Sequence, residues 1–380
     1  MKLLHLYSDW KWTGPAEPAL QTCRSLMDRG HEIVFACCRQ AMDYNESVPE
    51  KAREMGIEPL TRFGLDRHMP PLKTLHDLSS LPRYLAEERF DVVHCHLSHD
   101  HAFGGVCSRM VLKGRPAIVR SLYRRSVLRA SLPNRFLLRR LTDGYVVFTD
   151  AFRDEYVRRF ALLSERVAVS PMPVDLDRFG PGQKLKNMRA EFGIAADAPV
   201  IGIVGRFQKY RRADVFLEAA SHVLQQAPEA RFLVIGRSSQ LQDTVIKPME
   251  ELGIADRVIL TGYRIEDYVD TLACCDIFTL LMPGFDGTAR AVREAMALGI
   301  PCVVANYGML PEIVPHQQAG LVAETTPEAL AEAWLQFVQD PETRAELGKG
   351  ARRHAEMHFQ LDDIAPCLEK LYATVAGKDR

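Results

Sequence analysis

Long apolar runs and cysteines at metal-binding spacing are both missing from this chain of 380 residues. No run is long enough to cross a bilayer, and the apolar stretch at 1–9 is too short for a signal peptide. The nine cysteines show neither Cys-x-x-Cys nor His/Cys zinc spacing, and most lie in apolar runs, where a reduced thiol behaves as a small hydrophobe. We therefore expect a protein of the reducing cytoplasm that holds no metal.

Two common nucleotide-binding signatures are also missing. A dinucleotide-binding dehydrogenase would carry Gly-x-Gly-x-x-Gly after a strand, whereas the glycines of 202–205 lie inside a strand or at its end. A kinase-type phosphate loop, which ends in Gly-Lys and then Ser or Thr, does not occur either. The sequence thus argues against the two commonest classes of nucleotide enzyme.

Acidic residues are missing from one long stretch. The net charge is only -1, but residues 101–142 contain ten Lys or Arg and no Asp or Glu, with Leu, Val and Phe between them. We expect Pro133 to break one long helix there. Two interpretations stay open: a solvated helix face above core positions, or a surface for anionic lipid or an anionic acceptor through residues 109–140. No nucleic-acid-binding module is recognisable, so we expect no nucleic-acid partner.

Apolar strand-like runs alternate with helical patterns along the whole chain, which is typical of parallel α/β architecture. The length fits two domains. The expected strands are 3–7, 32–37, 92–96, 117–121, 145–149 and 167–170 in a first series, and 200–204, 231–235, 258–261, 277–281 and 302–305 in a second.

The segment between the two series is rich in Pro and Gly and predicts a linker. We therefore predict an N-terminal Rossmann-like domain at 1–172, a linker at 173–185 and a C-terminal Rossmann-like domain at 186–358. A helix at 359–380 is expected to return toward the N-terminal domain. Because parallel sheets bind ligands at the carboxyl ends of their strands, two such sheets that face each other would form a cleft.

The segment 285–301 combines a loop, a helix start, a helix and the following strand. Its carboxylates Asp286 and Glu294 lie eight positions apart, about 12 Å along a helix. A helix start offers free backbone N–H groups and a partial positive charge, so it suits a phosphate. A sugar nucleotide would fit this segment, although an ordinary core helix with one surface acid is the alternative. The predicted diphosphate contacts here are Gly287, Thr288, Ala289 and Arg290.

The loop 205–212 offers a second phosphate-binding candidate. Four cations, Arg206, Lys209, Arg211 and Arg212, lie on one strand-to-helix connection and repel one another. Guanidinium groups match phosphate oxygens in geometry, so a diphosphate would serve as their partner. A solvated basic loop is the alternative, but the position after a buried strand favours phosphate binding.

In their order and spacing, the motifs of this chain resemble those of retaining glycosyltransferases of the GT-B fold (group 1, family 4-like). The resemblance covers nearly the whole chain. It rests on the opening loop at Gly14, the Asp-Val-Val-His-x-His strand at 91–96, the linker at 174–179, the phosphate loop at 205–211, the two acids of 286–294 and the closing Glu-Ile-Val at 312–314.

The resemblance implies that a sugar passes from a nucleotide donor to an acceptor hydroxyl with retention at the anomeric carbon and without a metal or other cofactor. It implies that Asp286 contacts the donor sugar and Glu294 the ribose. The implied diphosphate ligands outside the helix start are Gly14, Arg206 and Arg211, with Lys209 as a rival to Arg211. We expect the nucleotide base near Gly236, Tyr263 and Arg264.

The implied acceptor is a glycan, a lipid-linked sugar or a lipopolysaccharide core. We accordingly expect a cytoplasmic enzyme that can be peripheral on the inner membrane face. Two rival functions stay open: a nucleotide-sugar epimerase, and a sugar-nucleotide-binding protein without transfer activity.

Several positions depart from the family pattern. Asp286 is one methylene shorter than the usual Glu, and Arg211 stands where a Lys is usual. Pro15 follows Gly14 and cannot donate an N–H, and the linker Gly is Pro173.

A histidine that many family members place near the donor sugar corresponds to Tyr123. Tyrosine can hydrogen-bond a sugar but is a poor base at neutral pH. Tyr123 and His96 are therefore our catalytic candidates beside Asp286, with His99 and His101 as further histidines near the same strand end.

Overall fold

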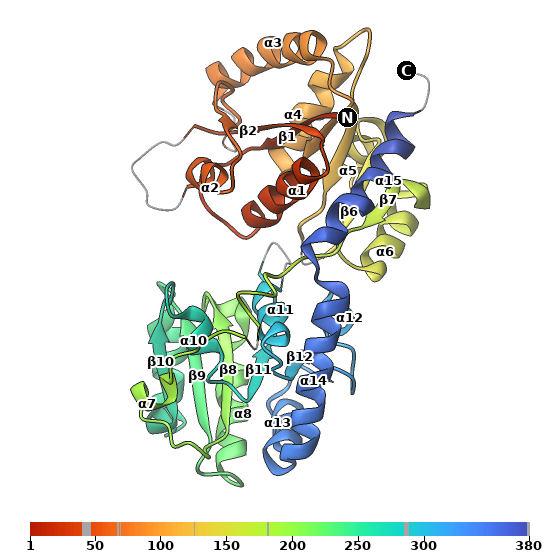
Figure 1. Ribbon diagram of the computed structural model, residues 1–380. Coiled ribbons are helices and arrows are strands. Elements are labelled where there is room, and N and C mark those ends of the chain that lie inside the picture. The colour runs from red at the N-terminus through yellow and green to blue at the C-terminus, as the bar shows by residue number, and fades with distance from the viewer. Residues whose placement is uncertain are drawn as a thin grey trace. The chain divides into compact units, whose positions relative to one another are not determined.

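The computed structural model describes residues 1–39, 47–66, 68, 70–124, 126–180, 182–284 and 289–377. These residues form two compact units, each with its own sheet (Figure 1). Unit 1 takes Met1–Pro173 and the C-terminal segment from Leu361 onward. Unit 2 takes Val174–Gly284 and Ala289–Gln360. The predicted α/β class with two parallel sheets is confirmed, and so is the return of the C-terminal helix to the first unit.

Unit 1 contains a parallel sheet in the order β3-β2-β1-β4-β5-β6-β7. Its strands are β1 (Lys2–Tyr7), β2 (Glu32–Cys37), β3 (Pro59–Leu60), β4 (Val92–Cys95), β5 (Ala117–Ser121), β6 (Gly144–Val147) and β7 (Val167–Val169). Its helices are α1 (Ala16–Asp28), α2 (Val48–Glu54), α3 (Pro71–Glu88), α4 (Ser98–Arg109), α5 (Leu132–Arg140), α6 (Asp150–Phe160) and α15 (Ile364–Ala376).

Apolar side chains on both faces of β1 explain why helices cover this sheet on both sides. Leu4 and Leu6 join the core under α3 and α4, whereas Leu3 joins the core under α15. Such runs, apolar at successive positions, are expected in parallel strands that are buried on both faces. The alternation of side chains along a strand then places every second residue of β4, including His94, on the same face as Leu3.

Helix α15, blue in Figure 1, is fastened to unit 1 by both apolar and polar contacts. Leu368, Leu371 and Tyr372 pack with residues of β1, β4, β5 and β6. The Glu369 carboxylate accepts hydrogen bonds from the Arg29 guanidinium at 2.8 and 2.9 Å. The last helix of the chain therefore completes the core of the first unit.

Unit 2 contains a second parallel sheet, in the order β10-β9-β8-β11-β12-β13. Its strands are β8 (Val200–Gly205), β9 (Arg231–Gly236), β10 (Val258–Gly262), β11 (Ile277–Leu280), β12 (Cys302–Ala305) and β13 (Gly320–Ala323). Its helices are α7 (Met188–Glu191), α8 (Ala213–Leu224), α9 (Lys247–Glu251), α10 (Tyr268–Leu272), α11 (Arg290–Ala297), α12 (Leu310–Ile313), α13 (Pro327–Gln339) and α14 (Pro341–His358).

Close packing around β8 and β9 requires glycine at two positions. A Cβ atom at Gly202 would collide with Cys275 Sγ, and one at Gly236 would collide with the Gly205 carbonyl. Gly236 also has φ +138°, which a side chain would strain. Gly236 was predicted to lie near the nucleotide base, and the structure shows that the contact between these two strand ends already requires a glycine there.

The structure corrects the sequence interpretation at a few elements. The eleven predicted strands are confirmed to within two residues at either end, but β3 and β13 were not predicted. Pro133 does not break a longer helix: it lies in the first turn of α5, which begins beside a Ser131 cap. Among the described residues, no helix is both long and apolar enough to cross a membrane.

Candidate functional site

The strand order of unit 2 reverses between β8 and β11. From β8 the chain moves outward to β9 and β10, and it then returns to add β11 on the other side of β8. Open parallel sheets bind ligands at such a switch point, beyond the carboxyl ends of the strands. The segments that follow β8 and β11 are therefore where a ligand of this unit is expected.

A basic turn follows β8 and contains Arg206, Lys209 and Arg211. The Arg211 Nη1 donates a 2.7 Å hydrogen bond to the carbonyl of Met282, which lies just after β11. This guanidinium thus spans the switch point. Its Nε is buried and has no hydrogen-bond partner within the described residues. A buried donor without a partner destabilises the unliganded state by about 1–3 kcal/mol, and an anion at this point would remove that cost.

The four cations of this turn are not equivalent. Arg212 forms an ion pair with Asp214 at 3.0 Å, so its charge is compensated inside the turn. No acidic partner is seen for Arg206, Lys209 or Arg211 in the part of the chain that the structure describes. Arg206 and Lys209 are exposed and Arg211 is half-buried. Three positive charges without an acidic partner among the described residues therefore follow the carboxyl end of β8.

Helix α11 presents Glu294 in a fixed orientation. Its side chain is nearly fully buried, and its two oxygens accept hydrogen bonds from Tyr268 Oη at 2.7 Å and from Arg290 Nε at 2.6 Å. Each carboxylate oxygen keeps a second lone pair for a further donor. Tyr268 starts α10, far from Glu294 in the sequence, so sequence patterns gave no indication of this partner.

The start of α11 is only partly described. Ala289 precedes the helix with φ +45°, and Arg290 is its first residue. The predicted sugar contact Asp286 and the predicted phosphate contacts Gly287 and Thr288 lie outside the described residues. Their roles remain predictions.

The loops after β9 and β10 carry the predicted base region. The Tyr263 ring is half-exposed, and the Arg237 guanidinium carbon lies 4.2 Å from its centroid. Arg237 was not among the predicted site residues. Arg264 instead donates to Asp267 at 2.6 Å and to the Thr261 carbonyl at 2.9 Å, so it stabilises its own loop.

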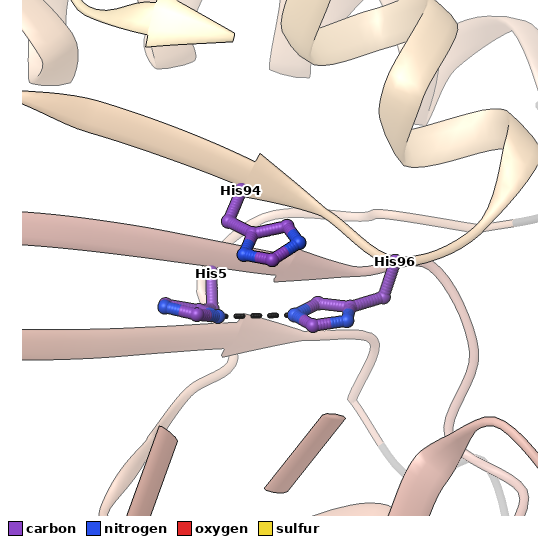
Figure 2. Close-up of side chains that lie close together, drawn as sticks. All are labelled: His5, His94 and His96. Carbon is purple, nitrogen blue, oxygen red and sulfur yellow. Dashed lines mark hydrogen bonds between the residues drawn. The ribbon is translucent and has the colours of Figure 1, made fainter. Parts of the chain in front are cut away.

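At the corresponding edge of unit 1, three histidines form a buried stack (Figure 2). His5 of β1 and His94 of β4 are register partners, and His96 lies two residues further on the same face. His5 Nδ1 and His96 Nε2 are 3.0 Å apart and share a hydrogen bond. His94 is hydrogen-bonded through both nitrogens, to Tyr372 Oη at 2.6 Å and to Ser121 Oγ at 2.8 Å.

The stack does not fit a metal ion. The rings of His94 and His96 lie 4.5 Å apart with only 15° between their planes, so their in-plane lone pairs run side by side and cannot converge on one ion. Both nitrogens of His94 are also engaged already. Burial lowers the pKa of His5 to about 3 and those of His94 and His96 well below their usual value. These imidazoles are therefore neutral at neutral pH.

The two catalytic candidates of unit 1 touch each other. The Tyr123 hydroxyl lies 3.4 Å from His96 Nδ1, and its ring stacks on His96 and Phe148. Burial raises the pKa of Tyr123 above its ordinary value, so the hydroxyl serves as a hydrogen-bonding group and not as a base. His101 is buried and bonded to Thr142 Oγ1 at 2.7 Å.

A buried ion pair lies beside this stack and was not predicted. Asp100 accepts backbone hydrogen bonds from Ser8 and Leu97, and Arg120 Nη1 lies 3.5 Å from its Oδ1. Burial raises the pKa of Asp100 to about 7, although Arg120 acts against this shift. Arg120 therefore belongs to the interior, and the basic tract at 109–140 is not one continuous surface.

The strand ends of unit 1 also border a pocket and a turn. The pocket is lined by Ser8, Lys73, Thr74 and His99 among others, from the segment after β1 and from α3 and α4. Gly14 lies exposed in the turn before α1, and the Thr13 hydroxyl next to it hydrogen-bonds Tyr7 Oη at 3.1 Å. This turn is thus attached to the end of β1.

Both halves of the chain match known sequence families. Residues 14–178 match the model described as Glycosyltransferase Family 4, and residues 185–354 match the model described as Glycosyl transferases group 1. Together the two matches take in most of the chain.

Relatives with curated functions cover nearly the full length. The chain is 23% identical over 365 residues to the N-acetyl-alpha-D-glucosaminyl L-malate synthase of Bacillus anthracis. This alignment covers 94% of this chain and 93% of the relative. It is 24% identical over 336 residues to the UDP-Gal:alpha-D-GlcNAc-diphosphoundecaprenol alpha-1,3-galactosyltransferase of Escherichia coli, covering 85% and 84%. Among solved structures, Anabaena HepE in complex with UDP superimposes with a TM-score of 0.81 at 18% identity, over 98% of this chain and 100% of that one.

Proposed function

The chain belongs to the group 1 glycosyltransferases of the GT-B fold, and on that premise we propose that it transfers a sugar with retention from a nucleoside diphosphate donor to an acceptor hydroxyl. One observation carries the proposal. Arg206, Lys209 and Arg211 have no acidic partner among the described residues, and Arg211 is anchored across the switch point by Met282. Fixed positive charges at that position suit a leaving diphosphate.

We propose the following bond changes. The bond between the anomeric carbon and the phosphate oxygen breaks, and the negative charge that develops on the diphosphate is stabilised by Arg206, Arg211 and Lys209. The acceptor oxygen attacks from the same face, and its proton passes to the departing phosphate oxygen. No protein base is required, which agrees with the lowered pKa of buried His96, which makes it a weak base, and with the raised pKa of Tyr123.

Two carboxylates have separate roles in this proposal. Glu294 accepts a hydrogen bond from a ribose hydroxyl on a free lone pair. Tyr268 and Arg290 fix the orientation of its carboxylate through their own hydrogen bonds. Asp286 contacts the donor sugar. The three cations of the turn supply the charge that a divalent metal supplies elsewhere, so we propose a metal-independent reaction.

We propose a UDP-sugar as donor and a lipid-linked saccharide as acceptor. The Escherichia coli relative is named for a UDP-Gal donor and a diphosphoundecaprenol acceptor, and Anabaena HepE was solved with UDP and with UDP-glucose. A lipopolysaccharide core is a further acceptor of the same chemical class. An acceptor of this kind would bring the enzyme to the cytoplasmic membrane face as a peripheral protein.

A donor screen and a product analysis test the proposal. Thermal unfolding with a panel of nucleotide sugars identifies the donor, because a ligand that binds only the folded chain raises its stability. Incubation with that donor, with and without lipid-linked acceptors and with a chelator, then gives the product and its anomeric configuration by NMR. An inverted product, or activity lost to the chelator, would contradict the stated mechanism.

The rival functions give different products. An epimerase would change the donor without any acceptor, and a binding protein would leave the donor intact across the acceptor panel. Asp286→Asn is expected to preserve nucleotide affinity and to depress transfer. Unaltered turnover in that variant would remove Asp286 from the reaction.

A further inference from the structure

The outer face of α5 combines exposed apolar side chains with arginines. Leu132 is 83% exposed and Phe136 59% exposed, whereas Leu138 on the inner face is 1% exposed. Residues four apart lie on one side of a helix, so Leu132 and Phe136 form one stripe. At about 100° per residue, Arg135 and Arg139 flank this stripe on one side and Arg140 on the other.

The arginines around this stripe are not compensated by acids. Arg129, Arg135, Arg139 and Arg140 are exposed, and no acidic partner is seen for any of them within the described ranges. The Arg135 Nε donates only to the Ala130 carbonyl, at 3.2 Å.

On the neighbouring helix α6, two of the three arginines are compensated, and only Arg158 is exposed without an acidic partner among the described residues. Arg153 pairs there with Asp150 and Asp154, and Arg159 pairs with Glu155. Within the described residues, arginines without an acidic partner are therefore more numerous on α5 than on α6, and on α5 they flank an exposed apolar stripe.

The inner side of α5 is firmly held, so its outer face is already formed. Leu138 packs inward, and its carbonyl accepts a hydrogen bond from Tyr145 Oη. At the end of the helix, Arg109 Nη2 donates to the Arg140 carbonyl at 2.8 Å, and Ser131 caps the start. Binding through this face would therefore require little ordering of the backbone.

We propose that the outer face of α5 (Leu132–Arg140), together with Arg129 just before the helix, docks on the surface of an anionic lipid bilayer. An apolar stripe flanked by arginines is the arrangement of helices that lie in the membrane interface, with the apolar side chains among the acyl chains and the cations at the headgroups. Charge complementarity selects this occupant: three arginines around two apolar side chains, with Arg129 just before the helix, have no acidic partner among the described residues and match a negatively charged apolar surface. The inference rests on the proposed lipid-linked acceptor for its purpose, but lipid binding can be measured without sugar transfer.

Vesicle flotation of the full chain tests the proposal. We expect recovery with vesicles of phosphatidylcholine and phosphatidylglycerol and little recovery with phosphatidylcholine alone, and we expect added salt to release the protein. Phe136→Ser should lower the partition coefficient by about tenfold. Arg139→Glu with Arg140→Glu should lower it by about tenfold or more.

Matched variants on other helices of unit 1 serve as controls. Leu72→Ser removes a leucine of α3 that is as exposed as Leu132. Arg158→Glu reverses the charge of an exposed arginine on α6. Both should bind the anionic vesicles as the parent does. An unchanged melting temperature and unchanged nucleotide affinity show that each variant is folded.

Three results would overturn the proposal: equal recovery with neutral and anionic vesicles, α5 variants that bind like the parent, or control variants that lose binding equally. Binding to a protein or to nucleic acid without binding to anionic vesicles would also overturn it. Loss of flotation with intact transfer to a soluble acceptor would refute this inference alone. Intact flotation without any transfer would refute the proposed function alone.

Discussion

In unit 1 the strand ends at the switch point carry neutral, buried imidazoles, whereas in unit 2 the turn after β8 carries three cations without an acidic partner among the described residues. His5, His94 and His96 are fully buried and bonded to one another or to Tyr372 and Ser121. In the turn after β8, by contrast, Arg206 and Lys209 are exposed and Arg211 is half-buried. Both sheets have the same order around the switch point, so the backbone does not set this difference.

The comparison shows how one architecture supports two tasks. The histidines of the stack in unit 1 are hydrogen-bonded to one another or to Tyr372 and Ser121, and His96 in turn holds Tyr123 in place. Arg206, Lys209 and Arg211 of unit 2 have no acidic partner among the described residues, so they favour an anionic ligand. Stability and ligand binding are therefore expected to respond to different changes in the two units.

Acid should have the largest effect: as the pH falls, unit 1 should unfold before unit 2. Burial lowers the pKa of His5, His94, His96 and His101, so between pH 6.5 and the lowered values the unfolded state binds protons that the folded state excludes. Each histidine then costs about 1.4 kcal/mol of stability per pH unit as the pH falls. Asp100, whose pKa is raised to about 7, offsets one of these protons.

Hydrogen exchange followed by peptide mass spectrometry reads the two units separately. Peptides of β1, β4 and α15 should lose protection at a higher pH than peptides of β8 and β9. Simultaneous loss in both units would contradict this assignment.

His94→Ala should come next in size and should act on unit 1 alone. The change leaves the hydroxyls of Tyr372 and Ser121 without their shared partner and opens a cavity, so we expect a loss of about 3–5 kcal/mol in the free energy of unfolding. Tyr372→Phe removes only one hydrogen bond and should cost about 1–2 kcal/mol. Urea unfolding measures both, and equal losses would show that His94 has no special role.

The paired and unpaired arginines of the basic turn allow a sharper test within unit 2. Arg206→Gln removes a charge that has no acidic partner among the described residues. It should raise the activation barrier of transfer by about 2 kcal/mol and so lower kcat/KM roughly thirtyfold. Arg212→Gln removes a charge that Asp214 already compensates and should change kcat/KM by less than about threefold. Equal effects of the two substitutions would mean that pairing within the turn does not matter.

Glu294→Gln should give the smallest of these effects, on nucleotide affinity. The carboxylate loses its charge but keeps its shape, so a ribose hydroxyl would be bound more weakly by about 1–2 kcal/mol. Calorimetry with the diphosphate nucleotide measures the change. Tyr268→Phe removes the hydrogen bond that orients the carboxylate and so reports how much that orientation contributes to nucleotide affinity. An unchanged affinity in Glu294→Gln would remove the ribose role.

Local patterns predicted much of the fold because the strands are short, apolar and separated by helical periodicity. Cys302–Ala305 and Glu32–Cys37 were placed correctly from their β-branched and apolar runs. The two-residue strand Pro59–Leu60 carries too little pattern to predict, since its pairing with β2 decides its conformation. Pro133 was misjudged because the same residue can end one helix or begin another, and only the Ser131 cap distinguishes the two.

The candidate site was predictable where a motif is local and not where it depends on packing. Arg206 and Arg211 follow a strand in sequence, so their place at its carboxyl end was foreseeable. The contact of Glu294 with Tyr268, and the enclosure of Arg120 with Asp100, arise from elements that meet only in the folded chain. A cation in a basic tract looks the same in sequence whether it is buried or exposed.

The central claim is that the basic turn of unit 2 binds a diphosphate, and Arg211 tests it most directly. Calorimetric titration of the parent and of Arg211→Ala with UDP and with uridine separates the phosphates from the nucleoside. We predict that Arg211→Ala weakens the binding of UDP by about 2–3 kcal/mol and leaves the affinity for uridine unchanged. Undiminished UDP affinity, or an equal loss for uridine, would contradict the claim.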